Sequence, residues 1–289
     1  PENQSSVWTP LFHTVWKPNE KARDQIRLSL TRSYKSPTLS SLIARPSVDS
    51  RYPVSGANTV VNPDRAGNPE LRPELAKGID LAFESYLRDG GSVSVNLFHR
   101  EIQDYMRNVT RLETVSWSAF PRWVSRTQNV GDAFTQGIEF EAKFRLDQVW
   151  PGAPRTEIRS NLSRFNSEVK SVPGPDNRLD QQPRFTGNFG LDHRFRQAPL
   201  RLGGNLNFTP QFVTRTDDDA VLRSGLKRVG DAYALWIFSP NAQLRLSGSN
   251  LHPIDFISMR SQIVGPLRQE ISSFNQSYIN WRIQWELKL

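Results

Sequence analysis

The chain has 289 residues, no cysteine and a formal net charge of +8, from 37 lysines and arginines against 29 aspartates and glutamates. This length suits one large all-β domain or two ordinary domains, and the lack of cysteine excludes a disulfide scaffold and thiolate metal sites. A basic balance can indicate nucleic acid or an anionic surface. Because the cations are spread along the chain instead of clustered, we expect no nucleic-acid partner.

No segment approaches the roughly 18 consecutive apolar residues of a transmembrane helix. This does not exclude a membrane β-barrel, because its strands alternate lipid-facing and lumen-facing residues. The first residues, Pro1–Gln4, have neither the basic nor the apolar region of a signal peptide. We therefore expect either that a signal peptide was removed or that the chain begins inside a longer protein.

Eleven stretches of alternating apolar and polar residues predict eleven β-strands. The alternation is clearest at the end of the chain, where every odd residue from Trp281 to Leu289 is apolar and every even one is polar or charged. A strand with this pattern buries one face and wets the other. The predicted strands lie at about 6–16, 26–31, 79–84, 93–105, 138–145, 155–169, 185–191, 200–208, up to 238, 244–246 and 281–289.

Short and long connections alternate between these strands. The turn sequences Lys17–Glu20 and Arg88–Gly91 mark two of the short ones, whereas the longest connection runs from about Lys35 to Glu74. Membrane barrels have short periplasmic turns and long extracellular loops, and a Greek-key sandwich has no reason to show this alternation. The pattern therefore predicts an antiparallel transmembrane β-barrel with its long loops outside the cell.

The faces of the strands agree with this prediction. An aromatic residue lies close to each short turn, as in the aromatic girdles at membrane interfaces: Trp16, Tyr86, Trp150, Phe195 and Phe238. In a soluble protein the same residues would be core residues at strand ends. The charged strand positions lie opposite the apolar residues, on a face that we expect to line a wet lumen or contact a plug: Arg27, Asp80, Glu84, Glu139, Lys143, Arg201, Arg245 and Glu286.

Several short motifs follow one another over nearly the whole chain. Ile26–Thr38 combines an alternating strand with an Arg-Ser-Tyr-x-x-Pro continuation, and Gly67–Glu74 reads Gly-Asn-Pro-x-Leu-x-Pro-Glu. Further on come Asn129–Ala133, Gly137–Glu141 and, near the last strand, 244–251. In order and spacing, these motifs resemble the C-terminal barrel half of TonB-dependent outer-membrane receptors.

The resemblance implies that residues 1–289 are about half of a barrel of roughly 22 strands, with the plug domain and the N-terminal strands absent. It implies a place in the bacterial outer membrane, contact with outer-membrane lipid, and energy-coupled uptake of a scarce ligand such as an iron–siderophore complex. The TonB complex would act through the absent plug. One departure is Leu289, where the family usually ends on an aromatic residue. We expect that the segment alone does not close into a stable barrel, because two strand edges would stay unpaired in lipid.

Two long connections carry the candidate ligand-binding residues. Aromatic and arginine side chains suit a large, flat or anionic ligand such as a ferric chelate, and these connections hold Arg45, Arg51, Tyr52, Trp117, Phe120, Arg122 and Trp123. The alternative is that these residues cap the barrel or touch lipopolysaccharide.

Signs of catalysis are missing from the sequence. The four histidines are scattered without ligand spacing, and no catalytic motif occurs. We therefore expect no enzyme, no cofactor and no metal site. For the chain as a whole, a passive outer-membrane porin and a soluble β-rich binding protein are the alternatives to a TonB-dependent receptor.

Overall fold

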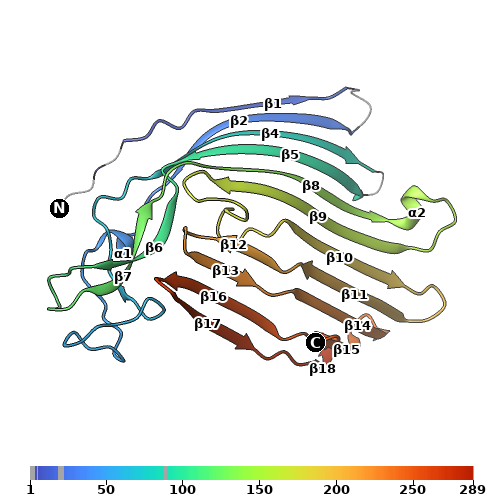
Figure 1. Cartoon of the computed structure of the whole chain (residues 1–289). Coiled ribbons are helices and arrows are strands. Elements are labelled where there is room, and N and C mark those ends of the chain that lie inside the picture. Colours follow the sequence, from blue (N-terminus) through green and yellow to red (C-terminus); the bar gives the residue numbers. More distant parts are fainter. Residues whose placement is uncertain (1–3, 5, 19–22, 88–89, 289) are drawn as a thin grey trace.

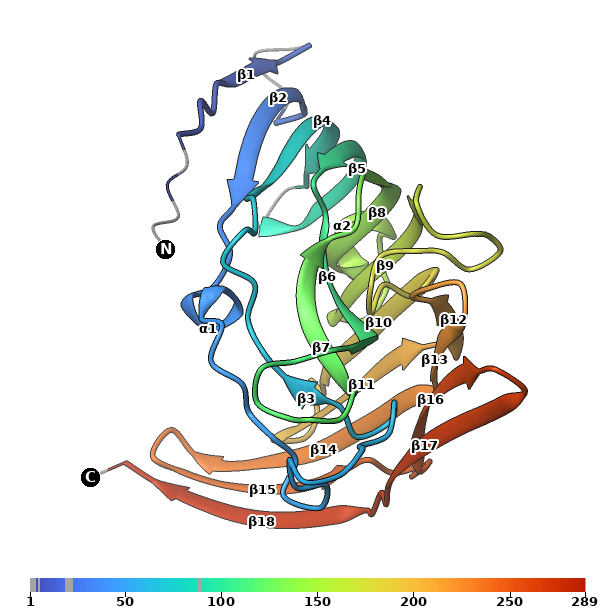
Figure 2. The same cartoon turned by 60° about the vertical axis from the view of Figure 1, so that its left-hand side comes forward.

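A computed structural model describes residues 4, 6–18, 23–87 and 90–288. Within this part, eleven strands form one antiparallel sheet, here called the main sheet, which bends from β1 at one edge to β18 at the other (Figures 1 and 2). The eleven predicted strands and the all-β class are confirmed. In sheet order the strands are β1 (Leu11–Trp16), β2 (Gln25–Lys35), β4 (Glu74–Tyr86), β5 (Ser92–Gln103), β8 (Ala133–Arg145), β9 (Thr156–Val169), β10 (Phe185–Arg194), β11 (Leu200–Thr209), β14 (Lys227–Ser239), β15 (Ala242–Ser249) and β18 (Asn280–Leu287).

One face of the main sheet is apolar from strand to strand. Leu81 of β4 lies opposite Leu28 of β2 on one side and Leu97 of β5 on the other, and Leu97 lies opposite Ile138 of β8. Residues directly opposite each other project on the same side, so the alternation gives these four strands one shared apolar face. Its side chains are exposed: Leu81 is 43% and Ile283 75% exposed. This is the surface that a lipid-facing wall requires.

The opposite face is polar and held by ion pairs, and the predicted charged positions lie on it. Arg27 pairs with Glu84 across β2 and β4, and the Arg100 guanidinium lies 3.0 Å from the Asp80 carboxylate. The prediction for Tyr86 as a girdle aromatic is wrong, because its hydroxyl donates a hydrogen bond to Glu84 on this polar face. Phe238 does lie on the apolar side, where its ring is 5.3 Å from the ring of Trp285.

The predicted alternation of connections is confirmed. The long connections lie at one end of the main sheet, at the left of Figure 1, and a short connection with the one-turn helix α2 (Leu146–Val149) lies at the other. Five residues of the predicted turns and terminus lie outside the described residues: Asn19, Glu20, Arg88, Asp89 and Leu289. The short connections are 17–24, 87–91, 146–155, 195–199 and 240–241, and the long ones are 36–73, 104–132, 170–184, 210–226 and 250–279.

The long connections, here together called the loop layer, are not plain loops as the sequence suggested. In the described residues they contain a three-stranded sheet, a four-stranded sheet and the one-turn helix α1 (Leu39–Leu42). Their short strands break the apolar–polar alternation, and two of them bury an arginine, Arg107 and Arg122, so the pattern did not reveal them. The strands are β3 (Asp64–Arg65), β7 (Arg122–Asn129) and β6 (Met106–Glu113) in one sheet, and β12 (Phe212–Arg215), β13 (Ala220–Ser224), β16 (Phe256–Val264) and β17 (Leu267–Asn275) in the other.

Compact packing is concentrated in the loop layer and where it meets the main sheet. Leu71 and Val124 are almost fully buried in the loop layer. At the junction, Tyr105 packs with Ala133 and Val169, at the long-loop ends of β8 and β9. No helix in the described part of the chain is long and apolar enough to cross a membrane.

Candidate functional site

A pocket of about 630 Å³ lies in the loop layer, among α1, β3, the β6–β7 hairpin and β16. Three arginines line it: Arg45, Arg65 and Arg260. The other lining residues include several serines and threonines and one asparagine, and none of the described lining residues is acidic. Guanidinium groups surrounded by hydroxyl and amide groups, without a carboxylate to neutralise them, form a site for an anion.

Backbone pairing places Arg45 and Arg65 on the same side of the loop layer. The Ser47 and Arg65 backbones form an antiparallel bridge, with nitrogen-to-oxygen distances of 2.7 and 2.9 Å. Arg65 in turn lies in β3, which pairs in parallel with β7 at Ser125. Because Arg45 is two residues before the bridge, it reaches the same pocket as Arg65.

Arg260 comes from a distant part of the chain. It lies in β16, and its Nη2 donates to the Thr110 hydroxyl of β6 over 3.0 Å. Burial lowers the pKa of the Arg260 guanidinium, because the charged form loses solvation. An anion in the pocket would stabilise this charge, which favours anion binding over binding of a neutral ligand.

A buried ion pair fixes the wall of the pocket next to Arg65. The side chains of Asp64 and Arg122 are both 0% exposed, with Arg122 Nη2 lying 2.7 Å from Asp64 Oδ1. Arg122 also donates to the backbone carbonyls of Tyr52 and Gly56, and Trp117 Nε1 donates to Asp64 over 2.9 Å. Burial alone would raise the pKa of the Asp64 carboxyl, but the hydrogen bonds from Arg122 and Trp117 outweigh it and hold that pKa below its usual range. The ion pair thus links the 36–73 connection to β7.

The structure separates the predicted binding residues into two groups. The side chains of Arg122 and Trp117 donate hydrogen bonds to Asp64 inside the loop layer. Trp123 donates its backbone N–H to the Asn58 side chain over 2.7 Å. Tyr52 is half-buried and gives its carbonyl oxygen to Arg122.

The other predicted residues are exposed. Phe120 is 48% exposed, and Arg51 is paired with Asp49 at 2.6 Å. Of the seven predicted residues, Arg45 is the one that lines the arginine pocket in the described structure. Sequence analysis missed Arg65 and Arg260. Arg65 lies in the same connection as Arg45 and could have been included, whereas nothing local marks Arg260.

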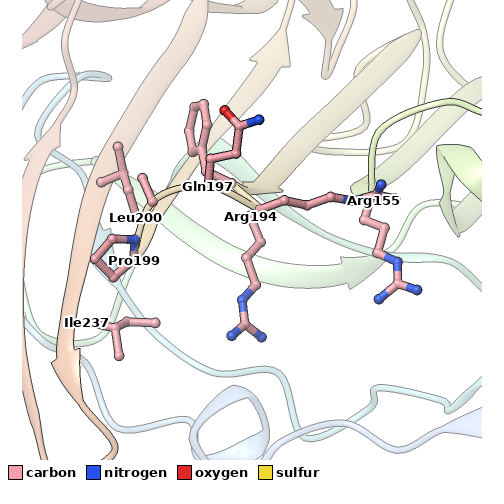
Figure 3. Close-up of a pocket in the computed structure, with 9 residues that line it drawn as sticks. Arg155, Arg194, Gln197, Pro199, Leu200 and Ile237 are labelled. Atoms are coloured by element: carbon pink, nitrogen blue, oxygen red, sulfur yellow. The ribbon is translucent and has the colours of Figure 1, made fainter.

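A second pocket, of about 890 Å³, lies at the short-turn end of the main sheet. Arg155, Arg194 and Arg196 line it, and Figure 3 shows Arg155 on one side and Pro199, Leu200 and Ile237 on the other. Because it lies at the end of the sheet away from the loop layer, it does not join the site formed by the long connections. In the described residues, no group of three or more histidine or acidic side chains is placed to hold a metal ion.

The chain is similar to a known family of β-barrel proteins. A family model described as TonB dependent receptor-like, beta-barrel matches residues 1–251. A search of curated proteins found no significant match.

Solved structures with a similar fold include a mutant of the ferric enterobactin receptor PfeA from Pseudomonas aeruginosa in complex with enterobactin (17% identity, TM-score 0.60, 86% of this chain and 36% of that chain). The siderophore receptor PirA from Pseudomonas aeruginosa (17% identity, TM-score 0.56, 94% and 42%) and the copper transporter OprC (16% identity, TM-score 0.59, 86% and 34%) are also similar. At these identities the likeness shows the fold, and the chain spans well under half of each of these chains.

Proposed function

We propose that this chain, which belongs to the TonB-dependent receptor-like β-barrel family, is the C-terminal part of an outer-membrane receptor. The ligand of the receptor is scarce and anionic. In this proposal the main sheet is about half of the barrel wall, and its polar face lines the lumen. The other strands, and a plug that contacts the TonB complex, belong to the remainder of the receptor. Uptake is energy-coupled, and the loop layer captures the ligand outside the cell.

The arginine pocket is the observation that carries this proposal. Arg45, Arg65 and Arg260 line it without an acidic neighbour, and the neighbouring Asp64–Arg122 pair holds its wall. A ferric siderophore of the catecholate type, which is large and negatively charged, has the chemistry that such a pocket would bind. Two of the structurally similar proteins are described as receptors for siderophores, which supports this class of ligand.

The test is a binding titration with the complete receptor and ferric enterobactin as the probe. Replacing Arg65 or Arg260 by glutamine should weaken binding about tenfold or more, because each substitution removes a charge-assisted hydrogen bond. Arg51→Gln is the matched control, since Arg51 lies in the same connection as Arg65 but is paired with Asp49 outside the pocket.

Two results would count against the proposal. Equal affinities for the wild type and the Arg65 and Arg260 variants would remove the pocket from ligand capture. Uptake of small solutes that does not depend on the TonB complex would instead identify a passive porin.

A further inference from the structure

The four-stranded sheet of the loop layer repeats the strand order of the main sheet. Its order is β12-β13-β16-β17, and the main-sheet strands to which these are joined lie in the order β11-β14-β15-β18. Strands that are neighbours in the main sheet therefore remain neighbours beyond its long-loop end, where Figure 1 shows the short strands. The four links between the two sheets are 210–211, 225–226, 250–255 and 276–279.

The two edges of the four-stranded sheet are finished differently. β12, at one edge, has four residues, and the backbone N–H of Arg215 donates to the carbonyl of Asp176 over 2.7 Å. The 170–184 connection thus covers this edge. β17, at the other edge, has nine residues, and in the described part of the chain its backbone pairs with β16 alone. Every second residue of β17 therefore turns its N–H and C=O groups to an open edge.

β17 lacks the features that protect a free edge. Such edges are usually short, or carry lysine, proline or a bulge. β17 contains neither lysine nor proline, and its register with β16 runs without a shift. Its two charged residues, Arg268 and Glu270, pair with each other at 2.5 Å. Apolar side chains stay exposed on both of its faces, with Phe274 56% and Ile271 40% exposed. A strand of this kind is typical of the inside of a sheet.

The free edge of β18 locates the strand that would cover β17. β18 pairs with β15 on one side and forms the edge of the main sheet on the other. It runs from Asn280 at the long-loop end to Leu287 at the short-turn end. An antiparallel neighbour would therefore leave the wall beside Asn280 and continue antiparallel to β17. β15 takes the same course on the other side, where it continues into β16.

We infer that the free edge of β17 is covered by the continuation of the wall strand that pairs with β18, in the part of the receptor that precedes Pro1. The inference rests on the proposed function, which places the other wall strands in the remainder of the receptor. The added strand satisfies the open backbone groups of β17 and turns the four-stranded sheet into one of at least five strands.

The added strand also extends the ligand site. Arg260 of β16 lies directly opposite Ile271 of β17, so the two side chains share one face of the sheet. That face is turned towards β6, because Arg260 donates to the Thr110 hydroxyl over 3.0 Å. On it, Arg260, Ile271 and Ser273 line a cavity of about 610 Å³. Side chains of the added strand next to Ile271 extend the wall of this cavity, so the preceding part of the receptor contributes to ligand capture.

The experiment is photo-crosslinking of the complete receptor in phosphatidylcholine vesicles. p-Benzoylphenylalanine replaces Phe274, Trp281 or Val213 in turn, and mass spectrometry identifies the captured peptide. Phe274 lies on the face of β17 opposite to Arg260 and Ile271, away from β6, and Trp281 lies near the start of β18. Both positions should capture peptides that precede Pro1, and the peptide captured at 274 should come directly after the one captured at 281. Val213 of β12, on the same face as Phe274, is the matched control and should capture neither peptide.

Hydrogen exchange resolved to single amides gives a second readout on the same receptor. If the edge is covered, consecutive amides of β17 are protected. If the edge is open, every second amide of β17 exchanges freely, because β16 can pair only with the others.

The outcomes separate this inference from the proposed function. If position 281 captures a peptide that precedes Pro1 but position 274 captures none, or every second amide of β17 exchanges freely, the inference is overturned and the proposed function stands. If position 281 captures no such peptide, the wall does not continue past β18 and both are overturned. Capture at 274 of another region of the receptor, of a second copy or of a different protein would mean that the assigned strand is wrong.

Discussion

The main sheet and the loop layer treat apolar side chains in opposite ways. In the main sheet the large apolar residues are exposed, as Ile283 is at 75% and Leu81 at 43%. In the loop layer Val60, Leu71 and Val124 are at most 1% exposed. The first arrangement is stable only against lipid, and the second is that of a small water-soluble domain. In the proposed membrane wall, one chain therefore folds against two solvents.

The two regions also differ in how they use arginine. On the polar face of the main sheet, arginines such as Arg27 and Arg100 stay about half exposed and pair with carboxylates. In the loop layer, Arg107 and Arg122 are buried, donate to backbone carbonyls, and are each ion-paired with a carboxylate. Besides its buried apolar residues, the loop layer uses these arginines to satisfy carbonyl groups that its irregular backbone leaves unpaired.

Replacing Arg122 by methionine should give the largest effect, and only in the loop layer. The change leaves the buried Asp64 carboxylate without its partner, which costs about 3–5 kcal/mol. Hydrogen exchange of the complete receptor should show lost protection in 36–73 and 104–132, with the main sheet unchanged. Arg51→Gln is the control, because the Arg51 side chain is 67% exposed and its bonds to Asp49 and Asn62 do not involve Asp64. Loss of protection in β4 and β5 as well would show that the two regions do not fold as separate units.

The same pair gives a pH test with a defined sign. The pKa of Asp64 is lowered in the folded state, so its contribution to stability is full above the unfolded pKa of about 3.9 and is lost as pH falls through the folded pKa. Wild-type loop protection should therefore decrease in acid. In the Arg122→Met variant the unpaired carboxyl is easier to bury once protonated, so protection should increase in acid instead. The same sign in both proteins would mean that Asp64 is not the titrating group.

A charge on the apolar face should damage the main sheet and leave the loop layer intact. Ile283→Lys in β18 should cost about 2–4 kcal/mol if that position lies near the middle of the membrane. Gln284→Lys, on the polar face of the same strand, should cost far less. Urea unfolding of the complete receptor in lipid vesicles measures both. Equal costs for the two variants would mean that the apolar face does not contact lipid.

How far the sequence predicts each region follows from the range of its contacts. A wall strand has one apolar and one polar face, so alternation within eight to thirteen residues is enough to find it, as in β18 and β8. The loop layer is held by pairs far apart in sequence, such as Arg122–Asp64 and Arg260–Thr110. A single sequence shows an arginine beside tryptophan at Arg122 but does not show whether that arginine is bonded inside the protein or free for a ligand. Only the structure shows that Arg45 lines the pocket and that Arg122 is bonded inside the loop layer.

A glycine on the polar face tests how tightly the main sheet is packed on that side. A Cβ on Gly203 would overlap the ring of Tyr233, which is held by its hydrogen bond to Asp192. Gly203→Ala should therefore cost about 1–3 kcal/mol by overpacking, measured by urea unfolding in lipid vesicles. Gly230→Ala is the matched control in β14, since the nearest atom to its Cβ would be Leu206 Cδ1 at 3.8 Å. Equal stability of the two variants would show that the Tyr233 ring moves freely.

The smallest effect is expected where the two sheets of the loop layer are joined at the surface. Arg111 of β6 lies 2.7 Å from Asp217, but its side chain is 49% exposed, so Arg111→Gln should cost no more than about 1 kcal/mol. Because the pair is wet, roughly 1 M salt should abolish the difference from the wild type. Arg107 is 2% exposed and donates to the backbone carbonyls of Thr216 and Arg178, so it joins the same connections from the inside. Arg107→Gln should therefore cost several times more stability than Arg111→Gln, and salt should not reduce that cost. Hydrogen exchange at 104–132 and 210–226 measures both changes. A larger and salt-resistant loss of protection in the Arg111 variant than in the Arg107 variant would mean that surface pairs hold the loop layer together. The contrast between the buried arginines of the loop layer and the half-exposed pairs of the main sheet would then be wrong.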